Sequence, residues 1–349
     1  MLFEIKDVDR QFYDDHLADF LPAKMVDIHT HVYLESHYRP ETQKSRGAKW
    51  PSKVAVDNSI EDLMETYRLM FPQQQVMPLI FTSPRTSIIF EEANGYISKV
   101  ARERHLPSLI VNSPEWSAEE LDRLVEEGGF LGLKPYLSYA PAHLGPNDIT
   151  IFDFLPHHQL EVADERGWIV VLHIPRGGRL KDPANLEQMM EIERRYPNVK
   201  LIIAHVGRAY CWEDVGNAFD VLKETEHMRF DFCANTNANV FEALLRAVGP
   251  KRVLFGSDLP ILRMRMRRIC ENGRYINIVP AGLYGDVSDD PHMREVTGEE
   301  ADRLSFFMYE EVLAFRAAAE AVGLSTADIE DAFYNNAMGL FAEVGAEFA

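Results

Sequence analysis

The chain has 349 residues, of which 46% are apolar, so it can bury a large core. Its 55 acidic and 36 basic residues give a net charge of −19, and such a surface repels phosphate backbones, which argues against nucleic-acid binding. The acidic first 20 residues contain no apolar core of a signal peptide, and no apolar run of about 18 residues predicts a membrane span. Three cysteines without metal-motif spacing fit a reducing compartment, and we expect a cytoplasmic protein.

Short apolar runs alternate along the chain with amphipathic stretches typical of helices. The predicted strands are residues 25–28, 76–81, 109–111, 130–134, 168–173, 199–205, 229–232 and 252–256. The predicted helices are residues 60–70, 91–104, 118–127, 154–166, 184–196, 215–225, 240–248 and 299–322. This alternation favours an α/β fold with parallel strands, and a (β/α)8 TIM barrel is the simplest way to close eight such units. An open doubly wound sheet is the alternative, although a glycine-rich turn would then be expected after the first strand.

We expect one domain over residues 1–349, with two insertions that interrupt the alternation. Residues 33–58 follow the first predicted strand and residues 259–298 follow the eighth, so both would lie over the barrel mouth. Residues 1–24 form a leader segment that either caps the barrel bottom or contacts a second subunit. The tail from Ser325 onward predicts two short helices packed on the outside of the barrel.

The pair His29 and His31 stands at the end of the first predicted strand, where residues i and i+2 share a face. Three later strands also end in residues of the metal-ligand type: His173, His205 and Asp258. In a barrel the carboxyl ends of the strands meet at one rim, where active sites lie. Imidazoles with a carboxylate suit a divalent metal, most simply Zn²⁺, although Mn²⁺ or another divalent ion also fits. The alternative is that these histidines only satisfy hydrogen bonds of the core, but four imidazoles at strand ends of one polarity are then unexplained.

Cationic and aromatic residues follow the same strand ends and suggest a small anionic substrate. Arg176 and Arg208 each come three residues after a strand-end histidine, and guanidinium groups bind carboxylates in a bidentate way. Tyr136, like other aromatic residues after strand ends, would stack on a planar substrate or simply pack the mouth. Lys134 would bind a substrate carboxylate or extend to solvent. The arginines at positions 263–268 are expected mostly on the solvated face of a helix.

Several motifs, in order, resemble those of the amidohydrolase superfamily, in its branch of metal-dependent hydrolases and related decarboxylases. They are Val26-Asp27-Ile28-His29-Thr30-His31, Gly132-Leu133-Lys134-Pro135-Tyr136, Val171-Leu172-His173, Ile203-Ala204-His205-Val206-Gly207, Leu254-Phe255-Gly256-Ser257-Asp258-Leu259-Pro260 and Tyr334-Asn335-Asn336-Ala337-Met338-Gly339-Leu340-Phe341. The resemblance spans residues 25–341. It implies that His29, His31, His173 and Asp258 bind the metal, that Asp258 is also the general base, and that His205 binds a second metal, polarises a carbonyl or moves a proton. In relatives with two metals the corresponding lysine is carboxylated and bridges them, which is a third alternative for Lys134.

The resemblance leaves more than one reaction open. The leading hypothesis is hydrolysis of a C–O or C–N bond in a carboxylate-bearing lactone, ester or amide through metal-activated water. The alternative is non-oxidative decarboxylation of an aromatic or enoic acid with the same ligands. A third hypothesis is a barrel that keeps a metal for structure or sensing, and a homodimer is expected only from the resemblance.

Overall fold

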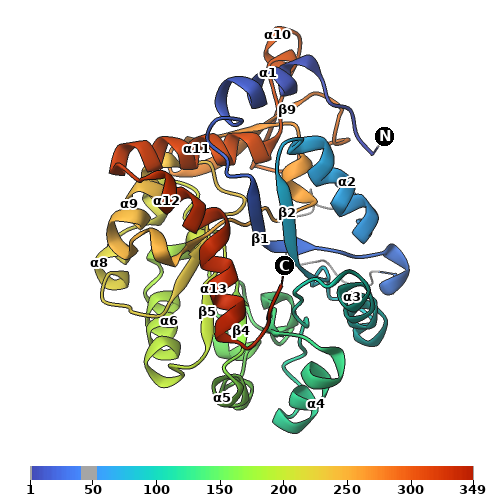
Figure 1. Ribbon diagram of the computed structural model, residues 1–349, viewed down its shortest axis with the longest axis vertical. Helices are drawn as coiled ribbons and strands as arrows, with labels where there is room; N and C mark the ends of the chain where they lie inside the picture. The colour runs from blue at the N-terminus through green and yellow to red at the C-terminus, as the bar shows by residue number, and fades with distance from the viewer. Residues whose placement is uncertain (1, 41–52, 349) are drawn as a thin grey trace.

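The computed structural model describes residues 2–40 and 53–348, so residues 41–52 of the predicted first insertion lie outside the described part (Figure 1). The helices are α1 Asp7–His16, α2 Ile60–Met70, α3 Phe90–Arg104, α4 Ala118–Gly128, α5 His157–Arg166, α6 Pro183–Arg195, α7 His205–Arg208, α8 Ala218–Leu222, α9 Ala238–Val248, α10 Glu299–Asp302, α11 Phe307–Val322, α12 Thr326–Glu330 and α13 Asn336–Glu343. The strands are β1 Lys24–His31, β2 Gln75–Phe81, β3 Gly132–Leu133, β4 Ile169–Leu172, β5 Lys200–Ile203, β6 Arg229–Asp231, β7 Val253–Leu254, β8 Arg267–Glu271, β9 Arg274–Pro280 and β10 Met293–Val296.

The predicted α/β fold with parallel strands is confirmed. Strands β3 to β7 form one parallel sheet in chain order, and β1 pairs in parallel with β2. Isolated parallel bridges join Ile80 to Ser108, Ile110 to Leu133 and Thr30 to Leu259. These bridges connect the predicted third strand and the end of the eighth to their neighbours. Helices α3, α4, α5, α6, α8 and α9 surround the strands in Figure 1.

Alternate residues of the strands enter two different apolar clusters. On β4, Ile169 and Val171 belong to a central cluster, whereas Val170 and Leu172 join the larger core beneath the helices. The central cluster also takes residues from the other strands: Val26, Ile28, Leu79, Phe81, Leu109, Ile202, Ala204 and Leu254. Because the central cluster covers one face of these parallel strands and the larger core covers the other, the strands are almost continuously apolar.

The C-terminal tail closes the central cluster, contrary to the prediction that it packs on the outside of the barrel. Ala337, Leu340 and Phe341 of α13 are buried in the central cluster together with the strand residues. Glu343 forms ion pairs with Lys200 and Arg229, which begin β5 and β6. Helix α13 therefore covers the amino ends of the strands, and it lies near the centre of Figure 1. Burial of the apolar stripe of α13 against this end stabilises the fold more than its exposure on an outer surface would.

The second predicted insertion contains a small sheet, with strand order β10-β9-β8, instead of the expected arginine-bearing helix. Arg263, Arg265 and Arg268 are buried, which corrects the expectation of a solvated face. Arg265 forms a buried ion pair with Asp9 of α1, at 2.6 Å. The leader helix α1 therefore packs on this sheet and on α11, and it does not cap the amino ends of the strands. Both lie at the top of Figure 1.

The single helix predicted over residues 299–322 is divided into α10 and α11. The backbone between them pairs with the insertion instead: Met266 N–H donates to the Ser305 carbonyl at 2.9 Å, and Phe307 N–H donates to the Met264 carbonyl at 2.8 Å. These bonds satisfy backbone groups outside the helix and therefore end it. By contrast, α2 begins as predicted, because Ser59 and Asp62 cap each other's backbone N–H groups.

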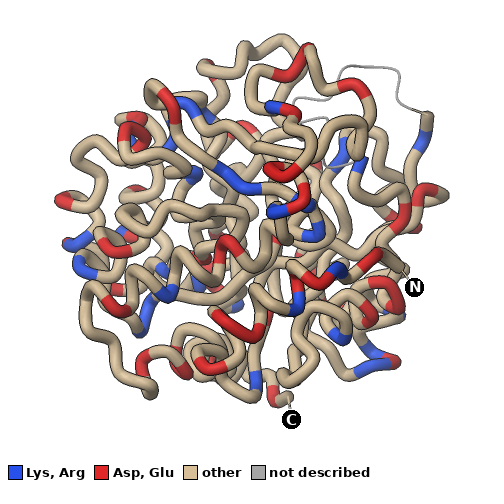
Figure 2. Tube along the Cα trace, turned by 90° about the horizontal axis from the view of Figure 1, so that it is seen from above, with Lys and Arg blue, Asp and Glu red and all other residues tan. Residues whose placement is uncertain are grey.

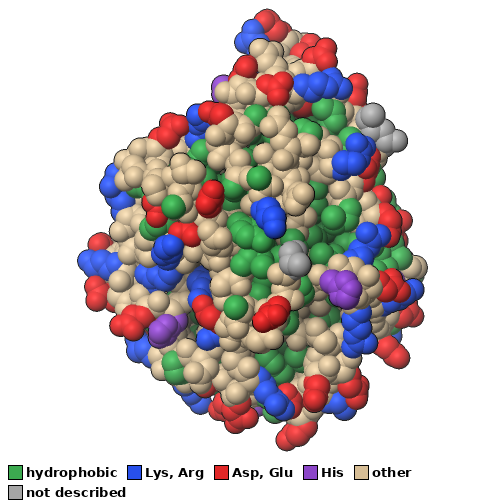
Figure 3. Space-filling view, viewed as in Figure 1, with side chains coloured by type: hydrophobic (Ala, Val, Ile, Leu, Met, Phe, Trp, Pro, Cys, Tyr) green, Lys and Arg blue, Asp and Glu red, His purple; other side chains and the backbone are tan. Residues whose placement is uncertain are grey.

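The excess negative charge is spread along the whole chain, with basic residues interspersed (Figure 2). On the face that Figure 3 shows, apolar side chains gather near the centre and charged ones surround them. Within residues 2–40 and 53–348, no helix combines the length and apolar character needed to cross a bilayer.

Candidate metal centre and active site

His29 and His31 lie at the carboxyl end of β1 and face the same space, as predicted. The pairing of β1 with β2 shifts register between Asp27 and Thr30, and this bulge turns both imidazoles toward Phe81. Nε2 of His29 lies 3.6 Å from Oδ1 of Asp258, and Nε2 of His31 lies 3.1 Å from the same oxygen. Asp258 is distant from both histidines in sequence. The structure therefore brings together three of the four predicted ligands: His29, His31 and Asp258.

Asp258 is held in an unusual backbone conformation beside the two histidines. Its φ is +54°, in the left-handed region, and its N–H donates to the His29 carbonyl at 2.8 Å. Burial alone would raise the pKa of the Asp258 carboxyl, but the hydrogen bond from His31 and the charges of the neighbouring imidazoles lower it to about 2. The carboxylate is therefore ionised throughout the physiological range. Backbone strain of this kind is concentrated at functional sites.

His205 begins a turn whose four residues all have positive φ: 57°, 48°, 61° and 60° from His205 to Arg208. The turn, labelled α7, is thus left-handed and differs from an ordinary helix. The backbone N–H of His205 donates to Oδ1 of Asp231 at 2.7 Å, which anchors the turn to β6. Burial is the main cause that lowers the pKa of the His205 imidazole, so the ring is neutral near pH 7.

Two residues behind the histidines were absent from the sequence prediction. Asp231 ends β6 and accepts from Nδ1 of His29 at 2.9 Å, and Cys233 Sγ lies 3.2 Å from the same nitrogen. Burial, followed by the charge of Asp231, raises the pKa of the Cys233 thiol well above its usual value, so it stays protonated. The signal that could have found them is the spacing: Asp231 and Cys233 stand at i and i+2 after a strand, like His29 and His31.

His173 follows β4 and lies beside His205 and Tyr136, with ring centroids 5.2 and 4.9 Å away. Its Nδ1 is buried and has no hydrogen-bond partner among the described residues. Burial, followed by the charge of Arg208, lowers the pKa of His173 well below its usual value. Burial also raises the pKa of Tyr136 to about 12, so its hydroxyl remains a hydrogen-bond donor. The predicted fourth ligand thus lies beside His205 but outside the group that His29, His31 and Asp258 form.

Lys134 follows β3 and points its amine into the same interior, so the prediction that it extends to solvent is wrong. Its side chain is fully buried, and Nζ has no hydrogen-bond partner among residues 2–40 and 53–348. Nζ lies 5.0 Å from the centre of the Phe81 ring. Burial lowers the pKa of Lys134 to about 8, while the charges of Asp231 and Asp258 oppose this decrease.

The two predicted substrate arginines have different surroundings. Nε of Arg176 lies 3.4 Å from Asp182 of its own loop, so part of its charge is already compensated. Arg208 uses Nη1 to donate to the carbonyls of residues 174–176 at 3.0–3.3 Å, which fixes the loop after His173. No ion pair of Arg208 occurs among the described residues. Burial lowers the pKa of His173 and raises that of Tyr210, and the charge of Arg208 adds to the first shift and opposes the second. Arg208 is therefore the better placed of the two.

The insertion sheet is fastened beside this centre. A disulfide joins Cys270 of β8 to Cys211 of the loop after His205. The three cysteines therefore no longer argue for a reducing compartment. Arg268, also on β8, is buried over the rings of Tyr210, Tyr275 and Phe307 and donates to the Ala234 carbonyl. Tyr210 in turn lies 6.3 Å from the His205 ring.

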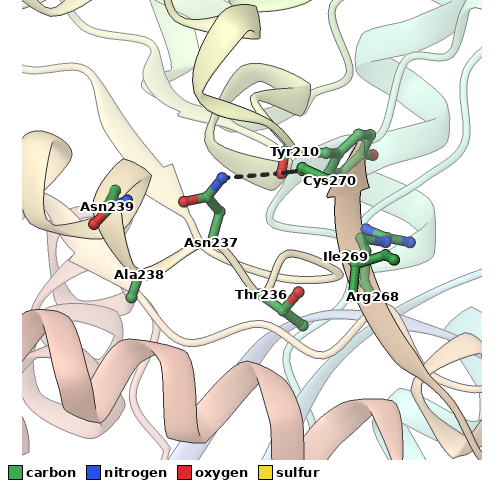
Figure 4. A pocket seen from close by; sticks show the side chains of 8 residues that line it. All are labelled: Tyr210, Thr236, Asn237, Ala238, Asn239, Arg268, Ile269 and Cys270. Atoms are coloured by element: carbon green, nitrogen blue, oxygen red, sulfur yellow. Dashed lines mark hydrogen bonds between the residues drawn. The ribbon is translucent and has the colours of Figure 1, made fainter. Parts of the chain in front are cut away.

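A small cavity of about 170 Å³ lies on the outer side of this contact (Figure 4). Asn237 at the start of α9 faces the edge of β8 across it and donates to the Tyr210 carbonyl at 3.3 Å. Arg268 extends its guanidinium away from Asn237, toward the aromatic rings. The cavity is therefore separate from the histidine cluster.

Solved structures of similar fold include both hydrolases and decarboxylases. A probable 2-pyrone-4,6-dicarboxylic acid hydrolase from Acinetobacter baumannii, with citric acid bound, is 15% identical and matches with a TM-score of 0.55 over 91% of this chain and 99% of its own. A dihydroxybenzoic acid decarboxylase from Polaromonas sp. JS666, with manganese and 2-nitroresorcinol bound, is 14% identical, with a TM-score of 0.54 over 92% and 97%. A 2,6-dihydroxybenzoate decarboxylase from Rhizobium is 13% identical, with a TM-score of 0.55 over 92% and 99%.

No curated protein matches the chain by sequence. The sequence profile described as amidohydrolase, however, matches residues 26–342, which include every motif that carried the resemblance. This match covers most of the 349 residues. The chain therefore belongs to the amidohydrolase family, whose members include both hydrolases and decarboxylases.

Proposed function

We propose that this protein is a metal-dependent hydrolase that acts on a C–O or C–N bond of a small carboxylate-bearing substrate. The proposed scaffold is a closed (β/α)8 barrel. Two backbone hydrogen bonds support closure, because Ile28 N–H donates to the Phe255 carbonyl at 3.0 Å and His31 N–H donates to the Leu259 carbonyl at 2.9 Å. The chain after β7 thus pairs with β1. The insertion at residues 259–298 would then lie beside the mouth, with its β8 edge near His205.

The donor set at the strand ends fits a divalent cation. His29, His31 and Asp258 converge within reach of one ion, and the buried Nδ1 of His173 has no hydrogen-bond partner in the described part of the chain, so it is free to bind a metal. We propose these four residues as the ligands, with Zn²⁺ as the first expectation and Mn²⁺ as the alternative. When bound there, such a cation would lower the pKa of water and polarise a carbonyl.

The chain's own residues fit distinct tasks around that position. Asp258 is an ionised carboxylate in contact with two imidazoles, so it can accept a proton from water and deliver it to the leaving group. The Nδ1–H of His205 donates to the Cys233 carbonyl at 3.1 Å, which leaves Nε2 as the nitrogen available to the substrate. Tyr136 can donate a hydrogen bond, and Lys134 and Arg208 can bind the substrate carboxylate. Arg176 would play a smaller part, since Asp182 already pairs with it.

Decarboxylation of an aromatic or enoic acid is the second candidate. The decarboxylases of similar fold favour it, and so do Tyr136 and Tyr210, whose rings lie 4.9 Å from His173 and 6.3 Å from His205. In that reaction a protonated side chain would donate to carbon, and no water would enter the product. Lys134, with its pKa near 8, could also hold the departing carboxylate.

The observation that carries the proposal is the convergence of His29, His31 and Asp258 in one buried space. The first test measures metal content of the purified protein and of His173→Ala, then turnover with 2-pyrone-4,6-dicarboxylate and 2,6-dihydroxybenzoate in ¹⁸O-labelled water. We expect the purified protein to contain one equivalent of metal and His173→Ala to contain less. We also expect ¹⁸O in the product of hydrolysis. Release of carbon dioxide together with an organic product that carries no ¹⁸O would favour decarboxylation instead. Protein that binds no added Zn²⁺ or Mn²⁺ would overturn both candidates.

A further inference from the structure

The Cys233 thiol lies between the imidazoles of His29 and His205, which have different roles in the proposed reaction. Its side chain is fully buried two residues after β6. Sγ lies 3.2 Å from Nδ1 of His29 and 3.1 Å from Nδ1 of His205. One sulfur atom therefore contacts a proposed metal ligand and the proposed proton-transfer residue at once.

The hydrogen bonds around the sulfur assign one tautomer to both rings. The Asp231 carboxylate only accepts, so His29 carries its proton on Nδ1, 2.9 Å from Oδ2 of Asp231. The Cys233 carbonyl also only accepts, so His205 carries its proton on Nδ1 as well, at 3.1 Å. The thiol donates to Oδ1 of Asp231 at 2.9 Å, so it does not donate its proton to either ring. Both Nε2 atoms are then left without a proton.

The packing leaves the rings little freedom while the sulfur is present. A methyl group at Gly256 would lie 3.0 Å from Cβ of His29 and 3.3 Å from Cβ of Cys233, closer than ordinary contacts. The rings of His29 and His205 are themselves 5.0 Å apart. Removal of the sulfur would therefore open a space directly beside both Nδ1 atoms, into which either ring could rotate.

We infer that Cys233 is a positioning residue, which fixes the spacing and rotation of His29 and His205 relative to each other and thereby keeps each Nδ1–H on its own acceptor. This inference rests on the proposed function for the roles of the two histidines. Groups that orient metal-binding histidines from behind usually change metal affinity about 10–100-fold when they are removed. Cys233 would thus couple metal binding to the ring that faces the substrate.

The test compares Cys233→Ala with Cys233→Ser and with Val240→Ala, a control that opens a similar space in the core under α9. Zn²⁺ affinity is measured by competition with a chelator, and thermal unfolding is measured in parallel. We expect Cys233→Ala to bind Zn²⁺ about 10-fold or more weakly, and Cys233→Ser to bind it with intermediate affinity. Val240→Ala should lose stability and keep its Zn²⁺ affinity. Unchanged Zn²⁺ affinity in Cys233→Ala would overturn the inference.

A second readout keeps the inference separable from the proposed function. ¹⁵N NMR of the metal-free protein reports which ring nitrogen of each histidine carries the proton. We expect His29 and His205 to be Nδ1–H tautomers in the wild type and mixed in Cys233→Ala. If the wild type binds no Zn²⁺, the proposed function fails, and unchanged tautomers in Cys233→Ala would then refute the positioning role by itself.

Discussion

The two ends of the parallel strands are built from opposite kinds of residue. At the carboxyl ends, imidazoles, carboxylates and one amine are buried together, and both His205 and Asp258 have left-handed backbones. At the amino ends, Leu340 and Phe341 of α13 complete an apolar cluster, and the charged groups there, such as Glu343, form ion pairs at the periphery.

This difference separates residues that provide chemistry from residues that provide stability. Nζ of Lys134 and Nδ1 of His173 are buried without partners among the residues that the structure describes, and such groups cost free energy of folding. They are tolerated where a ligand can satisfy them, whereas the apolar end gains free energy from burial. Substitutions at the carboxyl ends should therefore change activity more than stability, and substitutions under α13 should do the reverse.

The largest effect is expected for Asp258→Asn, which keeps the shape of the side chain and removes its charge. Without the carboxylate, the proposed proton acceptor is lost and one metal ligand is weakened. We expect kcat to fall about 10²–10⁴-fold, as is typical when a general base is removed. Metal analysis of the same sample should show reduced occupancy.

The matched control for this change is Asp289→Asn, at an exposed position of the insertion. It should leave kcat and metal content unchanged. Wild-type turnover by Asp258→Asn, or by His205→Ala, would contradict the proposed roles of these residues. The statement that the carboxyl ends provide the chemistry would then be wrong.

The apolar end is tested by Phe341→Ala. Phe341 is fully buried in the central cluster, so its truncation leaves a cavity that the surrounding strands cannot fill. We expect the free energy of unfolding, measured in urea, to fall by about 3 kcal/mol, with Zn²⁺ affinity unchanged. A large change in Zn²⁺ affinity with little loss of stability would show that the two ends are not separable in this way.

The sequence predicted most of the parallel strands and the proximity of His29 and His31, because both depend on local pattern. Apolar runs placed the strands within a few residues, and the rule that residues i and i+2 share a face brought His29 and His31 together. Asp231 and Cys233 were not predicted, because their importance depends on side chains distant in sequence.

Long-range packing explains the remaining corrections. The arginines near position 268 predicted an exposed helix, yet Arg268 is buried among three aromatic rings, which no local pattern encodes. The tail from Ser325 has the amphipathic pattern of any surface helix, and only the completed sheet offers it the apolar end that it covers. The break before α11 likewise arises because residues 305–307 pair with residues 264–266.

The smallest effect is expected for Glu310 of α11, which lies at neither end of the parallel strands. It therefore reports how much the burial of a polar group alone lowers the free energy of unfolding. Burial raises the pKa of its carboxyl to about 7 from an ordinary value of 4.5, although Arg267 opposes the shift. The folded state then binds more protons than the unfolded state between these two pH values. The free energy of unfolding therefore decreases as the pH rises from 4.5 to 7, and above that range the full cost is present.

Glu310→Gln removes this titration and should make the protein more stable above pH 7, with no difference below pH 4.5. Because the side chain is partly exposed, solvent screening reduces the effect, and we expect a gain of about 1 kcal/mol in urea unfolding at pH 8. Glu330→Gln, at an exposed position of α12, is the control and should show no such pH dependence. If Glu310→Gln is no more stable than the wild type at pH 8, burial of this carboxyl costs little, and the cost assigned to the buried polar groups at the strand ends must be revised downward as well.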